Sequence, residues 1–430
     1  MTSAGTSARL DYPVAEHVLD NGLRVIASPD HATGSVAVNL WYDVGSRHEE
    51  EGRTGFAHLF EHLMFQGSAN VKSSEHFALL QPAGATVNAT TWFDRTNYFE
   101  ALPAGGLDLA LWLEADRMGS LLTALTAENF ENQREVVKEE KRQRYDNVPY
   151  GDVMELILAQ VFPEGHPYRH TVIGSMDDLN AAGVEDAREF FRRFYMPNNA
   201  VLSIVGDVDP ETAFAKAAQY FDIVPAADRP EKLITDPLPP LTGLPRVETT
   251  QDVPSEAVYL TWRLPADRAP GFDALDLGFG VLGQGQSSRL IKSLVRGREI
   301  AESAYASAMG LVGGNSLGMV GARARAGTTP EELEDALLSE IDRLAAEPPT
   351  EAEVERAKAQ TERHWMQELA RIDSRADQLS GFATLYDDPQ LINTRFAEVE
   401  AISPGEVSEA IAEWFTPERR ASLIYRKEGR

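Results

Sequence analysis

The feature that most constrains the fold is a proline-rich stretch near the middle of the chain. Residues 225–245 of the 430-residue sequence contain six prolines. Proline lacks a backbone N–H and has a fixed φ, so this stretch cannot continue a helix or a central strand. We interpret it as an extended linker. It divides the chain into residues 1–224 and residues 246–430, and each part is long enough to form its own core.

Both parts alternate strand-like and helix-like segments. In the N-terminal part the expected strands are residues 23–28, 35–44 and 200–205, and the expected helices are residues 55–65, 106–121, 127–145 and 184–194. In the C-terminal part the expected strands are residues 257–264 and 421–425, and the expected helices are residues 272–282, 330–346 and 351–370. Because the two parts are similar in size and order, we expect a duplicated α/β unit.

Composition excludes several classes of partner and ligand. The formal net charge of -27 disfavours nucleic acid and anionic membranes as partners. No apolar run approaches the roughly 18–20 residues that span a bilayer. The sequence has no cysteine, so any metal must be held by His, Asp or Glu. The N-terminus lacks an apolar signal core, so we expect a cytoplasmic protein, or a periplasmic one if a signal peptide has been removed.

Residues 56–65 combine an apolar helical pattern with three ionisable side chains. Apart from His58, Glu61 and His62, every residue in this segment is apolar, which is typical of a buried helix. Burying such groups is costly unless they are paired or bind a metal. His58 and His62 lie four residues apart, so both imidazoles project from one face of the helix, which suits two ligands of a tetrahedral zinc ion. Glu61 is angled away from ligation and can take a proton from activated water.

Two other interpretations of this segment are less favoured. In the first, both histidines are hydrogen-bonded core residues and the pattern is a coincidence, which composition alone produces in roughly one chain in fifty of this length. In the second, the protein stores or senses metal, but such a site needs no general base beside its ligands. The apolar surroundings and Glu61 therefore favour a catalytic metal.

A hydrolytic zinc ion takes a third protein ligand and leaves one position for water. The helical segment 130–144 is the richest candidate, and its pattern predicts that Val136 and Val137 are buried. Glu140 follows these valines by four and three residues and shares their inward face. Glu139 lies on the shoulder of that face. The other charged residues of the segment fit a surface helix with ion pairs four residues apart.

The H-x-x-E-H segment, followed by a V-V-x-E-E helix, resembles the inverted zinc motif of the pitrilysin family of metallopeptidases. The family pattern places the third ligand at Glu140. His62 and Glu140 are 78 positions apart, slightly beyond the usual family spacing, so Glu139 stays open as an alternative. Family patterns also match residues 84–98, 195–207 and 282–290, so the likeness covers nearly the whole chain.

The resemblance implies an α+β fold of the pitrilysin/LuxS-like metallohydrolase type. Two tandem homologous α/β domains would each carry a mainly antiparallel sheet covered by helices, and together they would form half of a clamshell. The expected domains are an N-terminal catalytic zinc-binding domain (residues 1–224), the proline-rich linker (residues 225–245) and a C-terminal non-catalytic homologous domain (residues 246–430).

The resemblance also implies a zinc metalloendopeptidase that hydrolyses unstructured oligopeptides in a closed chamber. Zn²⁺ would be held by His58, His62 and Glu140, and Glu61 would be the catalytic base. In relatives, the stretch corresponding to residues 84–98 offers an edge strand to the substrate. The residues expected to bind substrate are Gly84, Ala85, Thr86 and Asn88. Backbone pairing of this kind leaves only alternate side chains to read the peptide.

One departure from the family pattern concerns the partner. Active relatives carry an Arg and a Tyr seven residues apart in the non-catalytic half. The favoured alignment puts Val295 and Glu302 at these positions, whereas a different register would use Arg298 and Tyr305. The favoured alignment implies a heterodimer with a related subunit that supplies Arg and Tyr, and a homodimer is the alternative. A non-catalytic scaffold or partner subunit is the competing function, although such relatives typically lose H-x-x-E-H.

A second pair of histidines is also spaced four residues apart. His166 and His170 flank Pro167 in a segment with the composition of a loop. A proline at this position argues against a helix that would present both rings on one face. We therefore expect a structural or substrate-wall role for these histidines and no second metal site.

Overall fold

The structure is a computed structural model that describes residues 10–233 and 235–429. It divides into two compact units, each built from three separate segments of the chain. The first unit comprises residues up to 141, residues 170–232 and residues 365–397. The second comprises residues 142–169, 233–364 and those from 398 onward. Each unit thus contains a segment from the other side of the proline-rich stretch: residues 142–169 belong to the second unit and residues 365–397 to the first. The division into domains at residues 225–245 stays a prediction.

The first unit is built on a mixed, mainly antiparallel sheet. Its strands are β1 (Ala15–Val18), β2 (Arg24–Pro29), β3 (Ser35–Tyr42), β4 (Thr86–Thr91), β5 (Thr96–Pro103) and β6 (Ala200–Gly206). They lie in the order β1-β2-β6-β3-β5-β4. The β2–β6 pair is parallel and the other neighbouring pairs are antiparallel. Strand β4 is therefore at one edge of the sheet.

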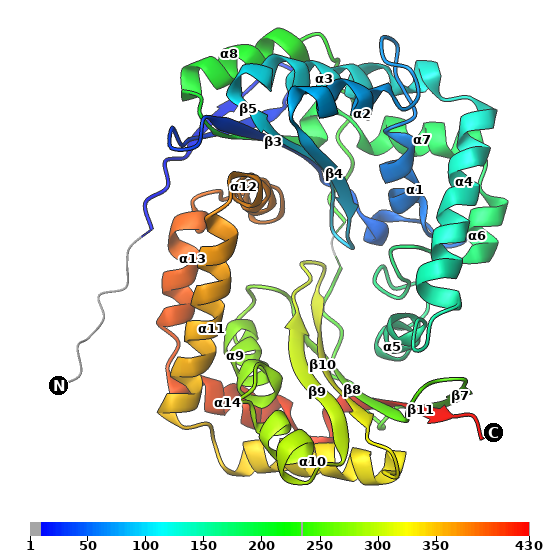
Figure 1. The fold of residues 1–430 in the computed structure, drawn as a ribbon, viewed down its shortest axis with the longest axis vertical. Coiled ribbons are helices and arrows are strands. Elements are labelled where there is room, and N and C mark those ends of the chain that lie inside the picture. The colour runs from blue at the N-terminus through cyan, green and yellow to red at the C-terminus, as the bar shows by residue number, and fades with distance from the viewer. Residues whose placement is uncertain (1–9, 234, 430) are drawn as a thin grey trace. The chain divides into compact units, whose positions relative to one another are not determined.

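Helices cover both faces of this sheet. The α-helices that lie wholly or mostly in this unit are α1 (Phe56–Leu63), α2 (Glu75–Leu80), α3 (Leu107–Ala124), α4 (Ala127–Lys141), α6 (Met176–Ala181), α7 (Val184–Phe194), α8 (Pro210–Phe221), α12 (Ile372–Tyr386) and α13 (Leu391–Glu400). Figure 1 shows α3 and α8 on one face and α12 on the other. Since both faces are covered, β3 is buried along nearly its whole length.

The second unit repeats the topology of the first. Its strands are β7 (Arg246–Gln251), β8 (Ala257–Pro265), β9 (Ala301–Met309), β10 (Asn315–Ala324) and β11 (Arg420–Lys427), in the order β7-β11-β8-β10-β9. The β7–β11 pair is parallel and the others are antiparallel, as in the series β2-β6-β3-β5-β4. This confirms the predicted fold class of two related α/β domains with mainly antiparallel sheets.

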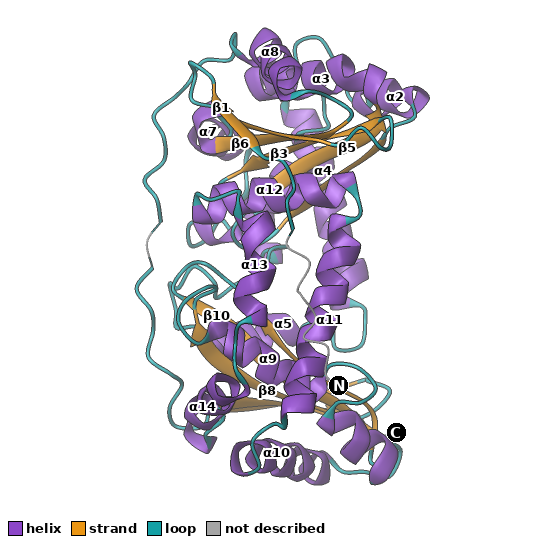
Figure 2. Ribbon diagram, turned by 90° about the vertical axis from the view of Figure 1, so that its left-hand side faces the viewer, coloured by secondary structure: helices purple, strands orange, loops and turns teal. Residues whose placement is uncertain are grey.

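Alternating side chains of β8 show how the second sheet is covered. Val258, Leu260 and Trp262 join a core with α9 (Phe272–Gly283), α10 (Pro330–Ala346) and α14 (Pro404–Trp414). Arg263 points the other way, because neighbouring strand residues face opposite sides, and its guanidinium donates to the carbonyl of Val161 at the end of α5 (Val153–Val161). Figure 2 shows these layers of helix and strand. The remaining long helix, α11 (Glu351–Leu369), begins in the second unit.

Helix α4 ends in a different helical form, and the helices of the described residues are not of the membrane-spanning kind. The helix expected over residues 127–145 is α-helical to Lys141 and continues as a π-helical segment, Arg142–Asp146. The helices of residues 10–233 and 235–429 are all too short or too polar to cross a lipid bilayer.

Candidate metal centre

Helix α1 begins at a carboxylate supplied by a preceding loop. The backbone N–H groups of Gly55 and Ala57 donate to the two carboxylate oxygens of Glu49, at 2.8 and 2.7 Å. These are N–H groups that a helix leaves without internal partners, and a negative charge is favourable beside them. Gly55 has φ 91°, and a Cβ there would lie 2.7 Å from the carbonyl oxygen of Ile173. A glycine and a buried acid therefore fix where the helix starts.

His58, His62 and Glu140 come together in the first unit. One Glu140 carboxylate oxygen, Oε2, lies 3.8 Å from His58 Nε2 and 3.4 Å from His62 Nε2. The two imidazole rings are 4.9 Å apart at their centroids and inclined by 79°. All three side chains are mostly buried, with exposed fractions of 12, 23 and 17%. The sequence placed the two histidines on one helix face, and the structure brings the glutamate of α4 to both.

The environment of α4 corrects part of the sequence argument. Val137 is fully buried, but Val136 is 44% exposed, so the prediction that both valines face inward was wrong for Val136. Four residues of helix turn by about 400°, which leaves Glu140 some 40° away from Val136. Glu139 is exposed, whereas Glu140 is partly buried beside the histidines. This placement favours Glu140 over Glu139, although the ligand assignment itself stays a prediction.

Glu61 is held by the neighbouring edge strand. The Thr91 hydroxyl, at the end of β4, donates to Glu61 Oε2 at 2.6 Å. Burial raises the pKa of Glu61 above its ordinary value, while the Thr91 hydrogen bond and the nearby His62 act in the opposite direction. The sequence did not predict the Thr91 contact, because no local pattern links α1 with a strand that begins more than twenty residues later.

The four residues expected to bind substrate lie at or just before β4. Gly84 and Ala85 precede the strand, and Thr86 and Asn88 belong to it. Among the described residues β4 pairs only with β5, from Thr86 opposite Ala101 to Thr91 opposite Thr96. One edge of the strand is thus available for backbone pairing with another chain. Its function in substrate binding is still a prediction.

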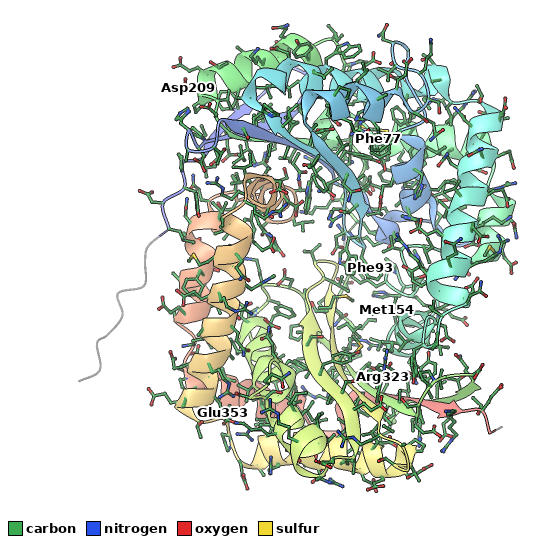
Figure 3. All side chains as sticks on the ribbon, in the orientation of Figure 1. Phe77, Phe93, Met154, Asp209, Arg323 and Glu353 are labelled. Carbon is green, nitrogen blue, oxygen red and sulfur yellow. The ribbon has the colours of Figure 1, made fainter. Side chains whose placement is uncertain are left out.

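The β4–β5 turn carries two aromatic residues with different surroundings. Phe93, labelled in Figure 3, is buried, and its carbonyl oxygen accepts a hydrogen bond from the Arg47 backbone at 3.0 Å. Trp92 is 43% exposed. The turn is therefore anchored on one side, and it presents an indole next to the end of the strand that holds Glu61.

The histidines of the other pair belong to different units and have separate local contacts. His166 belongs to the second unit, where its ring stacks on Phe162 at 4.5 Å and its Nδ1 accepts the Tyr168 backbone N–H at 3.1 Å. His170 belongs to the first unit, and its Nδ1 lies 3.6 Å from the helix-capping carboxylate of Glu49. The structural or substrate-wall role expected for both residues stays a prediction.

The two possible Arg–Tyr pairs lie around β9 in the second unit. Glu302 and Tyr305 are on the strand, Val295 is in the preceding π-helical segment (Ile291–Gly297) and Arg298 follows that segment directly. Strand β9 occupies the edge position that β4 occupies in the first sheet. Which register corresponds to the family pattern remains a prediction.

A second cluster of potential ligands was not predicted from the sequence. His76, Glu100 and Glu114 bring one side-chain ligand atom each within 4.8 Å of one another, and all three are buried. They come from α2, β5 and α3, so sequence spacing gave no signal. Both oxygens of Glu114 accept hydrogen bonds from Arg117, with Nε at 3.0 Å from Oε2. A cation is thus already present in this cluster, which argues against a second metal ion.

The His58–His62–Glu140 group fits a zinc ion better. Two imidazole nitrogens and a carboxylate oxygen are typical zinc ligands, and three protein ligands leave a position for water. Both Nε2 atoms approach the same carboxylate oxygen, so all three donors face one point. A second carboxylate, that of Glu61, lies near His62 and Glu140. A hydrolytic metal centre combines metal ligands with a base of this kind.

The fold and this donor set define a metallopeptidase-like class of protein with an inverted zinc motif. Sequence comparison places the chain within a family. Residues 24–173 match the model of insulinase (peptidase family M16), and residues 182–361 match the model of the peptidase M16 inactive domain. The zinc protease PqqE of Helicobacter pylori is 33% identical over 386 residues, covering 88% of this chain and 85% of that protein. The chain belongs to peptidase family M16.

Other relatives and solved structures agree with this assignment. An uncharacterized zinc protease of Mycobacterium tuberculosis is 27% identical over 415 residues, which cover 96% of this chain and 92% of that protein. The crystal structure of a protease from Helicobacter pylori has a TM-score of 0.89 at 29% identity, covering 96% of this chain and all (100%) of that one. The first half of the periplasmic protease PqqL from Escherichia coli, at 18% identity and a TM-score of 0.77 over 97% of this chain and 93% of that one, shows the same fold.

Proposed function

We propose that this chain is a zinc metalloendopeptidase that hydrolyses unstructured oligopeptides. His58, His62 and Glu140 would hold the zinc ion, and Glu61 would act as the general base. The observation that carries the proposal is the approach of both histidine Nε2 atoms to one oxygen of Glu140, beside a carboxylate that an edge strand holds in place. The relatives named as zinc proteases support it.

The residues of this chain have separate tasks in the reaction. A bound zinc ion would lower the pKa of a water molecule to about 7 and polarise the scissile carbonyl. Glu61 would accept a proton from the attacking water and deliver it to the leaving amine. Burial, which raises the pKa of Glu61, suits a group that must both take and return a proton near neutral pH. Thr91 fixes the carboxylate by donating to Oε2, which leaves Oε1 for the water.

Strand β4 would bind the substrate backbone. An extended peptide can add to the free edge of β4 by main-chain hydrogen bonds, with Gly84, Ala85, Thr86 and Asn88 along its path. Since Thr91 ends the strand and contacts Glu61, a peptide lying along this edge passes close to the base. Backbone pairing selects extended, unfolded peptides with little regard for sequence.

We also propose that the working enzyme is a dimer with a related subunit. The favoured alignment leaves Val295 and Glu302 where active relatives have Arg and Tyr, so a partner would supply that pair. The yeast relative named mitochondrial-processing peptidase subunit beta is by its name one subunit of an enzyme; it is 28% identical over 221 residues, or 50% of this chain and 46% of that protein. Gel filtration and activity of the isolated chain test this, and full activity as a homodimer would contradict it.

Replacing the base tests the catalytic proposal. Glu61→Gln keeps the size and the hydrogen-bond acceptor of the side chain but cannot take a proton. In the native complex, isolated through a tag on this chain, we expect zinc content to be kept and peptide hydrolysis to fall by roughly 10²–10⁴-fold. Glu51→Gln, at an exposed glutamate before α1, is the matched control and should leave both unchanged.

Two results of that experiment would contradict the proposal. Normal hydrolysis by the Glu61→Gln variant would remove Glu61 from the mechanism. A wild-type complex that holds zinc but cleaves no unstructured peptide would favour the competing function, which is a non-catalytic subunit. The match of residues 182–361 to the M16 inactive-domain model is the observation in favour of that function.

A further inference from the structure

Helix α12 packs against the face of the first sheet that lies opposite α3 and α8. Asp377, Ser380 and Gly381 are spaced three and four residues apart, so they lie on one side of the helix. A Cβ on Gly381 would lie 2.9 Å from the ring of Trp41, so the absence of a side chain there lets the helix approach the strand β3 closely. This close approach brings Asp377 to the polar side chains of the sheet.

The Asp377 carboxylate collects hydrogen bonds from two strands. Its Oδ1 accepts from Trp41 Nε1 at 2.8 Å, Asn97 Nδ2 at 2.8 Å and Asn39 Nδ2 at 3.4 Å. Trp41 and Asn39 belong to β3 and Asn97 to β5, where Trp41 is directly opposite Asn97. One carboxylate oxygen of α12 therefore fixes the amide orientation of Asn97 within the sheet.

Asn97 in turn holds the end of β4. With its amide nitrogen directed at Asp377, its Oδ1 accepts from the Thr90 hydroxyl at 2.5 Å and from Arg95 Nη1 at 3.3 Å. The same Arg95 nitrogen donates to the carbonyl oxygen of Thr90 at 2.9 Å. Both the side chain and the backbone of Thr90 are thus fixed by neighbours that depend on one another.

Thr90 is followed in β4 by Thr91, whose hydroxyl holds Glu61 at 2.6 Å. The contacts therefore form a continuous series from Asp377 through Asn97, Thr90 and Thr91 to the proposed base. No member of the series before Thr91 is a proposed zinc ligand or base. Asp377 lies 316 positions after Glu61 in the sequence and outside both segments that the M16 family models match.

We propose that Asp377 is a positioning residue for Glu61, acting through Asn97 and the end of strand β4. This inference rests on the proposed peptidase function and adds a residue to it. Small displacements of a reacting group are costly, since a misplacement of about 1 Å can lower the rate by roughly 10²-fold. Loss of Asp377 releases the Asn97 amide, loosens Thr90 and lets the Thr91–Glu61 hydrogen bond lengthen.

A role for Asp377 only in packing α12 makes a different prediction, and the same helix offers a control. The Ser380 hydroxyl is fully buried and donates to Ser203 Oγ at 2.7 Å, with the Asn39 carbonyl oxygen at 3.4 Å as a second acceptor. It joins α12 to the same face of the same sheet, but Ser203 lies in β6, away from β4. Ser380→Ala therefore removes a buried contact of α12 that involves neither Asn97, Thr90 nor Thr91.

A double-mutant cycle in the native complex tests the proposal. Zinc content, KM and kcat are measured for Asp377→Ala, Thr91→Val and the double variant. We expect Asp377→Ala to keep its zinc and to lower kcat roughly tenfold with little change in KM, a loss of about 1.4 kcal/mol. The double variant should be no slower than Thr91→Val alone, because both changes break one series of contacts. Asp377→Asn keeps an Oδ1 acceptor and should restore most of kcat.

Ser380→Ala, carried through the same cycle, should change kcat little and combine additively with Thr91→Val. Additive losses for Asp377→Ala and Thr91→Val would overturn the proposal, as would equal effects of Asp377→Ala and Ser380→Ala. If Asp377→Ala fails to fold, Thr90→Val takes its place, because it breaks the Thr90–Asn97 bond of the same series. A wild type without peptidase activity would instead refute the proposed function.

Discussion

Glu100 and Glu114 are buried side by side, with one arginine between two carboxyl groups. Arg117 makes paired hydrogen bonds to Glu114, whereas its Nη2 is 3.8 Å from Glu100 Oε1. His76 Nε2 lies 3.6 Å from the same oxygen. Within the described chain, no N–H or O–H group donates a hydrogen bond to either oxygen of Glu100. A fully ionised Glu100 would therefore be a buried charge without adequate compensation.

The protonation states follow from these surroundings. Burial, followed by the charge of Glu114, raises the pKa of Glu100 well above 4.5. Burial and then Arg117 lower the pKa of His76 to about 2. Burial also raises the pKa of Tyr42, which faces Glu114 and Arg117 from β3, and that of Tyr98 on β5. The raised pKa favours the protonated, neutral form of Glu100, the lowered pKa favours a neutral His76, and Glu114 pairs with Arg117.

Glu100→Gln should make folding stability less sensitive to a rise in pH above 4.5. The folded state keeps a proton on Glu100 that the unfolded chain releases near pH 4.5, so folding stability falls as pH rises from 4.5 to the raised folded value. The slope for one group is about 1.4 kcal/mol per pH unit. Glutamine resembles the protonated acid and removes this slope. Urea unfolding of both proteins from pH 5 to pH 9 measures the difference.

Glu114→Gln is the matched comparison. It breaks a buried ion pair and should cost about 3–5 kcal/mol. Equal pH dependence of stability in the wild type and Glu100→Gln would contradict the assignment of the proton to Glu100. His76 has the opposite effect on the pH dependence of stability, because its lowered pKa makes stability fall as pH drops below 6.5. This effect is present in both the wild type and Glu100→Gln.

At the scale of single residues, the sequence predicted what helical spacing determines. His58, Glu61 and His62 are placed by one turn of helix, so their relation could be read without a structure. Glu140 was selected on an inward face that included Val136, and Val136 proved to be exposed. The contacts of Thr91 and Asp377 join elements far apart in the sequence, and no local period indicates them.

At the scale of elements, helices and strands with a strong apolar period were predicted correctly, and those without one were missed. Helices such as α7 and α10 begin and end where expected, because apolar and polar residues alternate with the helical period. Strand β4 has the sequence TVNATT, without a clear apolar face, and it was found only through family resemblance. Helix α12 was not predicted; it places the small residues Ser380 and Gly381 against the sheet, beside Leu379 and Phe382, which join the core.

Helices α12 and α13 complete the core of the first unit. The C-terminal segment that belongs to this unit, residues 365–397, is called the returning segment. The shared core contains Ile26 and Val205 from the sheet and the following residues of the returning segment: Leu369, Leu379, Phe382, Leu391 and Ile392. Burying each of these five large side chains contributes about 1.5–3 kcal/mol. Together they match the roughly 5–15 kcal/mol by which whole domains are stable.

A chain that ends at residue 364 should therefore not keep a folded first unit. It lacks α12 and α13, and its sheet exposes the face that contains Ile26 and Val205. We expect the loss of the cooperative thermal transition of that unit and rapid proteolysis within residues 10–232, with the full chain as control. An unchanged transition and unchanged protection of residues 10–232 would show that the returning helices are not required.

At the scale of the whole molecule, the same topology occurs twice, but the proposed metal ligands occur in only one unit. Helix α9 follows β8 as α1 follows β3, yet its sequence FDALDLGFGVLG contains no histidine. The duplication was predictable from the order of helices and strands. The exchange of residues 142–169 and 365–397 between sequence halves was not, because it depends on long-range contacts that local patterns do not encode.

The central claim is that His58, His62 and Glu140 form the zinc site on which peptide hydrolysis depends. Zinc content and hydrolysis of an unstructured peptide, measured on the same native complexes carrying Glu140→Gln or Glu139→Gln, test it most directly. We predict that Glu140→Gln loses zinc from this chain and loses hydrolysis, while Glu139→Gln keeps both, because Glu139 is exposed and Glu140 adjoins both histidines. Stoichiometric zinc and normal hydrolysis in the Glu140→Gln complex would contradict the account.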